Sequence, residues 1–214
     1  MPSPDASSIN PGSAPRRAAL VVGGTGRIGR VVVRAVAAAG FDVAVHCHAA
    51  LPAARELAAA VGGRSLAVTA DLREEGAVRA VVHRVADHFA GLDAVVIAAG
   101  RRRPTPLEEL TVDDLRAHFE VNVAGGCVVT QEAGAVMRHQ PRGGVIVWVG
   151  CRSAPNRPGD APYLATTPVI PALVRGLAAE FADRDPLVRV GCVEAGDEDP
   201  STVAAAVVAR LASP

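Results

Sequence analysis

The chain has 214 residues, enough for one domain with a substantial hydrophobic core. Its 22 basic and 22 acidic residues balance, so it lacks the basic surplus of a general nucleic-acid binder, and its apolar stretches stay short of the roughly 20 residues that span a bilayer. Because the chain opens with no signal segment and its four cysteines show no paired metal-ligand spacing, we expect a cytoplasmic protein without a metal, nucleic-acid or membrane partner.

The elements expected along the chain alternate between strands and helices. Residues 1–16 are rich in Pro, Ser and Ala without an apolar period, which predicts a disordered tail before one domain over residues 17–214. Short β-branched runs, typical of strands, lie at Ala18–Val22, Asp42–His46, Ser65–Thr69, Ala94–Ala98, Gly144–Val149 and Val188–Val193. Apolar residues at helical spacing lie between or after them, at Ile28–Ala39, Leu51–Val61, Glu75–Phe89, Asp113–Arg138, Val169–Ala182 and Ser201–Leu211.

This alternation predicts an α/β fold with a single doubly wound parallel sheet, Rossmann-like, and helices on both faces. The Val-, Ile- and Leu-rich runs carry few polar residues, which is typical of strands that are buried on both sides.

A glycine-rich segment from Gly23 to Gly29, with the sequence GGTGRIG, follows the first predicted strand and opens the first predicted helix. Glycines let the backbone turn tightly and approach a pyrophosphate, whose charge the helix N-terminus stabilises. In this position the segment predicts a dinucleotide site, and the alternative is a tight turn that binds nothing.

From Arg17 to Gly196 the chain resembles the short-chain dehydrogenase/reductase family. Pteridine reductases are the branch that it resembles most closely, because they also place arginine at the position of Arg27 in the glycine-rich loop. The segments His46-Cys47-His48 and Pro104-Thr105-Pro106-Leu107 are similar to motifs of the same branch.

The resemblance implies a set of residues that bind the dinucleotide, including Asp71 and Leu72 at the adenine ring. The end of the second strand carries no acidic residue for the ribose hydroxyls, and Arg27 is the best-placed arginine for a 2′-phosphate, so NADP is preferred over NAD. The alternative is that no dinucleotide binds. The implied set is Gly23, Thr25, Arg27, Ile28, Gly29, His48, Asp71, Leu72, Ala99, Gly100 and Thr167.

The same resemblance implies an active site that is degenerate. The family uses a tyrosine, a lysine four residues later that lowers the tyrosine pKa, an upstream serine and a helical asparagine. Tyr163 and Asn122 match, whereas the serine falls on Gly150 or, with one deletion, on Cys151, and the lysine position is Thr167. All 22 basic residues of the chain are arginine, so no lysine is available elsewhere. We therefore predict Tyr163, Asn122 and Cys151 as the remaining catalytic residues.

Prolines and a short C-terminal segment are further departures from the family. Pro168 and Pro171 lie inside the helix that should display Tyr163, which predicts a break or a late helix start that leaves Tyr163 and Thr167 in a loop. After Gly196 the chain leads almost directly into its last predicted helix, so the family's substrate flap and last strand are expected to be missing.

The segment Arg101-Arg102-Arg103 follows the fourth strand, whose end borders the substrate site in the family. Guanidinium groups bind carboxylates and phosphates, so these residues predict an anionic small-molecule substrate or ligand. The alternative is a solvated loop that pairs with Glu108, Glu109 or the acidic segment near the C-terminus. The resemblance also implies a homodimer through helices four and five.

Three functions follow from these observations. The first is an NAD(P)H-dependent oxidoreductase whose hydride transfer is weak, altered or lost. The second is a pseudoenzyme that binds a dinucleotide or another small ligand. The third is a non-redox enzyme, such as an isomerase, lyase or cyclase, that uses the same pocket.

Overall fold

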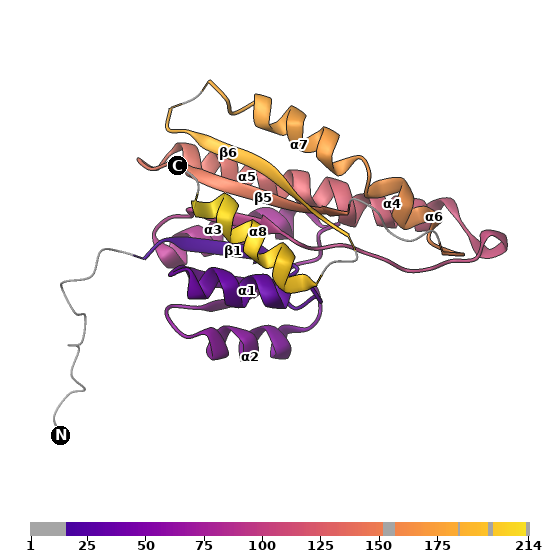
Figure 1. The fold of residues 1–214 in the computed structure, drawn as a ribbon, viewed down its shortest axis with the longest axis horizontal. Helices are drawn as coiled ribbons and strands as arrows, with labels where there is room; N and C mark the ends of the chain where they lie inside the picture. The colour runs from indigo at the N-terminus through magenta and orange to yellow at the C-terminus, as the bar shows by residue number, and fades with distance from the viewer. Residues whose placement is uncertain (1–15, 152–156, 184, 197–198, 213–214) are drawn as a thin grey trace.

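The structure is a computed structural model that describes residues 16–151, 157–183, 185–196 and 199–212 (Figure 1). The tail predicted over residues 1–16 lies outside this part except for Arg16, whose guanidinium pairs with Asp42 at 3.3 Å and donates to the carbonyl oxygens of Gly40 and Phe41.

The predicted single parallel sheet with helices on both faces is confirmed. The described residues form six parallel strands in the order β3-β2-β1-β4-β5-β6. The strands are β1 (Ala18–Val22), β2 (Asp42–Cys47), β3 (Leu66–Thr69), β4 (Ala94–Ile97), β5 (Gly144–Cys151) and β6 (Val188–Ala195). The helices are α1 (Gly29–Ala38), α2 (Leu51–Val61), α3 (Glu75–Phe89), α4 (Val112–Phe119), α5 (Gly125–Arg138), α6 (Ala161–Thr166), α7 (Ile170–Ala179) and α8 (Pro200–Ala212), with a short 3-10 turn at Leu107–Glu109.

Alternate residues of the central strand β1 face two separate hydrophobic layers. Ala19 and Val21 pack with α1, α2 and α8, whereas Leu20 and Val22 pack with α3, α5 and α7. Figure 1 shows α8 running beside α1 on one face of the sheet. Since successive side chains of a strand point to opposite faces, the unbroken apolar run in β1 serves both layers.

The long helix predicted at Asp113–Arg138 is continuous but changes its winding. Thr111 begins α4 with a capping box, in which its hydroxyl accepts from the Asp114 N–H at 3.1 Å. A π-helical segment, Glu120–Ala124 (η2), then joins α4 to α5. Such segments insert an extra residue into a helix and are frequent at functional sites, and this one carries the predicted site residue Asn122.

The single helix that was expected to display Tyr163 and to contain both prolines is divided into two helices, α6 and α7. α6 ends at Thr166, and Pro171 falls in the first turn of α7, where a missing N–H costs little. The predicted late helix start is therefore confirmed. The expected loop is wrong for Tyr163, which lies in the six-residue α6, and correct for Thr167, which follows it.

Candidate functional site

A cavity of about 690 Å³ lies where the strand order reverses between β1 and β4, at the carboxyl ends of the strands. Open α/β sheets bind ligands at this position, and the volume is typical of small-molecule sites. The cavity is lined by Gly23, Thr25, Gly26, Arg27, Ile28, His46, Cys47, His48, Asp71, Leu72, Arg73, Ala98, Ala99, Gly100, Arg101, Arg102, Arg103, Val121 and Tyr163.

The glycines of the first loop are required by close backbone packing. Gly23 has a φ of +77°, and a Cβ atom there would lie 2.6 Å from the Ala99 Cα atom. A Cβ atom on Gly29 would lie 2.1 Å from the Gly23 carbonyl oxygen, behind the cavity wall. α1 begins without a side-chain cap, and the N–H groups of Arg30 and Val31 in its first turn donate to the carbonyl oxygens of Gly26 and Ile28 at 3.0 Å.

His46 holds the glycine-rich loop in place. Its Nδ1 atom accepts from the Gly23 N–H at 3.2 Å, so Nε2 carries the proton and donates to the Ala70 carbonyl oxygen at 3.2 Å. The side chain is buried, and this burial lowers the pKa of His46 from 6.5 to about 4. Because both ring nitrogens are engaged, His46 is a neutral structural link between β1, β2 and the residue after β3.

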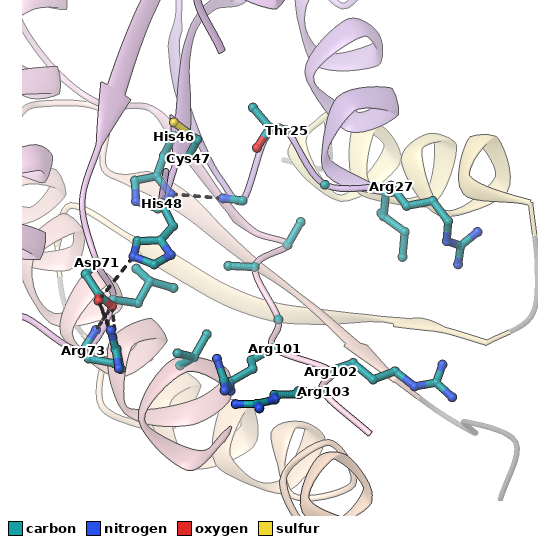
Figure 2. A pocket seen from close by; sticks show the side chains of 18 of the residues that line it. Thr25, Arg27, His46, Cys47, His48, Asp71, Arg73, Arg101, Arg102 and Arg103 are labelled. Atoms are coloured by element: carbon teal, nitrogen blue, oxygen red, sulfur yellow. Dashed lines mark hydrogen bonds and ion pairs between the residues drawn. The ribbon is translucent and has the colours of Figure 1, made fainter. Parts of the chain in front are cut away.

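The carboxylate of Asp71, predicted at the adenine ring, is already paired within the protein. Arg73 donates to both of its oxygens, with the shortest contact at 2.5 Å, and the His48 Nε2 atom lies 3.4 Å away (Figure 2). The hydrogen bonds from Arg73 are the main cause that lowers the pKa of Asp71 to about 2. Arg73 was not predicted as a site residue, although its position two residues after Asp71 was a usable signal.

Asn122 joins two parts of the site instead of facing the cavity. Its Oδ1 atom accepts from the Arg101 N–H at 2.6 Å, and its Nδ2 atom donates to the Arg101 carbonyl oxygen at 3.1 Å and to the Thr166 hydroxyl at 2.8 Å. Asn122 is buried. It therefore ties the loop after β4 to the end of α6.

Tyr163 lines the cavity, and Arg102 is beside it. The Arg102 guanidinium carbon lies 5.4 Å from the centroid of the Tyr163 ring. Arg102 also donates to both carboxylate oxygens of Asp160, at 3.0 and 2.5 Å, and this pairing lowers the Asp160 pKa. Asp160, immediately before α6, is an acidic partner of Arg102 that was not expected, whereas Asp197 and Glu198 of the expected C-terminal acidic segment lie outside the described residues.

The other predicted arginines point to different sides of the cavity. Figure 2 shows Arg101 and Arg103 extending to one side of their loop and Arg102 to the other. Arg27 extends toward α8, away from His48 and Asp71, and its charge contributes to lowering the Asp199 pKa, which hydrogen bonds from Ser201 lower most.

Most of the predicted site residues line one cavity. Asn122, Thr167 and Gly29 do not: Asn122 and Thr167 are buried, and Gly29 supports the loop. Cys151 is the last residue of β5, and its side chain lies outside the described part of the structure. His46, Cys47, Gly26, Ala98 and Val121 line the cavity without having been predicted as site residues.

The helices of the described segments include none long and apolar enough to cross a membrane. The same segments hold no group of three or more His, Cys, Asp or Glu side chains that could hold a metal ion.

Comparison with known proteins identifies the family. A model of the short chain dehydrogenase family matches residues 17–210, so the chain belongs to the short-chain dehydrogenase/reductase family, a class of oxidoreductases that bind NAD(P). A short chain dehydrogenase from Burkholderia cenocepacia, solved in complex with NADP, is 31% identical with a TM-score of 0.80, and the match covers 90% of this chain and 89% of that one. A dehydrogenase/reductase from Sinorhizobium meliloti is 28% identical with a TM-score of 0.82, covering 92% and 88%.

The curated relatives are oxidoreductases that are longer than the matched region. An uncharacterized oxidoreductase of Bacillus subtilis, YuxG, is 33% identical over 77% of this chain, and hydroxynaphthalene reductase arp2 of Aspergillus fumigatus is 31% identical over 82%. The matches span only 25% and 63% of the length of these two relatives.

Proposed function

We propose that this protein binds a nicotinamide dinucleotide in the described cavity and that its hydride transfer is weak or lost. The observation that carries the second part is the buried, uncharged Thr167 at the family's lysine position, whose N–H bonds to the Tyr163 carbonyl oxygen at 3.2 Å. Free tyrosine has a pKa near ~10, so proton exchange at neutral pH requires a nearby positive charge. The active site is degenerate in this respect.

Arg102 is the residue that could best supply the positive charge of the missing lysine, but the charge of Asp160 largely offsets it. A bidentate pair with the buried Asp160 places a negative charge beside the guanidinium, and the field at the Tyr163 ring is correspondingly weaker than that of an isolated cation. Arg102 therefore orients the Tyr163 ring more than it lowers the pKa of the tyrosine. This supports a protein that binds its ligand over one that catalyses hydride transfer efficiently.

We propose NADP as the preferred dinucleotide. β2 ends in Cys47 followed by His48, without an acidic residue, and Arg73 offsets the one nearby carboxylate, Asp71. The Burkholderia cenocepacia structure with NADP supports the same preference. The assignment to the pteridine reductase-like branch and the cytoplasmic location remain predictions.

A homodimer is also part of this proposal. Val112, Leu115 and Phe119 form an apolar stripe on α4, and Phe119 is 51% exposed. Residues at this spacing share one face of a helix, and a second copy would cover them. Phe119→Arg is expected to convert a dimer to a monomer in light scattering coupled to size-exclusion chromatography, and a wild-type monomer would refute the homodimer.

Calorimetric titration with NADPH and with NADH tests the binding proposal. We expect both to bind, NADPH more tightly, and we expect NADPH oxidation with a panel of carbonyl and pterin substrates to be slow. Thr167→Lys should raise this rate and Thr167→Ala should not, because only lysine restores the positive charge. Binding without turnover selects the pseudoenzyme. Turnover of an anionic compound without dinucleotide binding selects the non-redox enzyme and refutes the proposal.

A further inference from the structure

The Arg101 side chain lines the cavity and carries a buried donor without a partner. Its Nε atom is buried and has no hydrogen-bond partner, and no ion pair joins its guanidinium to a carboxylate in the described segments. Buried donors in folded proteins are satisfied by protein groups, ordered water or ligands. A partly buried guanidinium whose buried Nε atom has no partner is therefore a specific feature of this cavity wall.

The backbone of Arg101 is fixed, so its side chain starts from a defined point. Asn122 accepts from its N–H and donates to its carbonyl oxygen, at 2.6 and 3.1 Å. The next residue, Arg102, extends to the opposite side of the loop (Figure 2). Arg101 differs in this respect from a freely moving surface arginine.

Two arginines of the cavity are neutralised by carboxylates, whereas Arg27, Arg101 and Arg103 form no ion pair in the described segments. The lining includes five arginines and one aspartate. Arg73 pairs with Asp71 and Arg102 pairs with Asp160, whereas Arg101 forms no ion pair in the described segments. The wall at Arg101 is therefore positive in a chain whose formal net charge is zero, and it attracts an anion.

We infer that Arg101 is the centre of an anion-binding subsite that takes a phosphate or carboxylate group. A guanidinium donates in a planar fork that matches both groups. The anion belongs either to the dinucleotide or to a second small molecule that is bound beside it. The inference rests on the proposed function only where the anion is a group of the dinucleotide.

The test compares wild-type protein with Arg101→Gln and with Arg175→Gln, which removes the same charge from an exposed position on α7. Calorimetry measures the Kd of NADPH, and then the Kd of inorganic phosphate for protein saturated with NADPH and for protein alone. We expect Arg101→Gln to weaken one of these ligands by roughly tenfold to a hundredfold, because a charge-assisted hydrogen bond is lost. Arg175→Gln should leave both unchanged.

The results separate the two sources of the anion. Weaker NADPH binding assigns the subsite to the dinucleotide, whereas unchanged NADPH binding with loss of phosphate binding assigns it to a second ligand. If wild-type protein binds phosphate but no dinucleotide, the proposed function fails and the subsite stands. If Arg101→Gln changes neither ligand, or Arg175→Gln causes the same loss, the inference is overturned.

Two further measurements distinguish the anion subsite from other roles of Arg101. Because the guanidinium has no protein acceptor, Arg101→Gln should not lower the melting temperature, and a lower value would reveal a structural partner and overturn the inference. Adenosine carries no charge, so its Kd should not change in Arg101→Gln. An equal loss for adenosine and NADPH would show stacking on the base and would also overturn it.

Discussion

Acid should destabilise this protein in a pH range that is set by His46. The folded protein lowers the pKa of this histidine from 6.5 to about 4, mainly through burial. The unfolded chain therefore binds a proton that the folded protein resists, and stability is full above pH 6.5 and is lost as the pH falls toward 4. Integrating this difference gives a loss of roughly 2 kcal/mol between about pH 7.5 and pH 5.

Urea unfolding at these two pH values measures the loss. Trp148 is the only tryptophan and is 1% exposed, so its fluorescence reports the unfolding of the core. His46→Asn cannot titrate and should flatten the dependence on pH, whereas His139→Asn, at an exposed position after α5, should retain it.

An equal dependence on pH in wild-type protein and in His46→Asn would refute this reasoning. The titration of Asp71 does not contribute in this pH range. Its pKa is lowered from 3.8 to about 2 in the folded protein, so the stability that it contributes is lost only below pH 3.8. Since His46 accepts from the Gly23 N–H and stays neutral in the folded protein until the pH approaches 4, the affinity of the folded protein for NADPH should decrease only near that lower pH.

Three further predictions concern the frame of the site. Gly29→Ala should cost about 3 kcal/mol or more in urea unfolding, because its Cβ atom would meet a backbone oxygen at 2.1 Å, whereas Gly76→Ala, which meets no atom within 4 Å, should be neutral or stabilising. Asn122→Leu should cost roughly 3 kcal/mol, because buried partners of three hydrogen bonds are left unpaired. Tyr163 is the only tyrosine, so the absorbance of tyrosinate, at about 295 nm, follows its ionisation as the pH rises. Arg102→Gln removes a nearby positive charge and should move this transition to higher pH, and an unchanged transition would exclude an influence of Arg102 on Tyr163.

The sheet and the location of the cavity could be predicted because they depend on local patterns. The helices Leu51–Val61 and Glu75–Phe89 have the predicted bounds, since apolar residues recur at helical spacing between clear breaks. The residues that follow β1 to β4 meet because the carboxyl ends of parallel strands lie at one edge of a sheet. Strand ends were less accurate: β5 extends to Cys151 because it pairs with β6 along its whole length.

The pairings inside the site could not be predicted because they join distant positions. Arg102 and Asp160 are separated by 58 positions, and Asn122 and Thr166 by 44, so no local pattern selects these partners. The pairing of Arg73 with Asp71 is an exception, because the two residues are only two positions apart and their opposite charges could have indicated a local pair. The π-helical segment carries Asn122, whose partners Arg101 and Thr166 are likewise distant in the sequence.

The arginine lining of the cavity has a consequence for how the protein responds to its surroundings. A guanidinium stays charged at every pH at which proteins remain folded, whereas a lysine ammonium can lose its proton when it is buried. The attraction of this cavity for anions therefore does not switch off in alkaline solution. Salt, which screens charge without changing protonation, is the variable that should control the occupancy of this site.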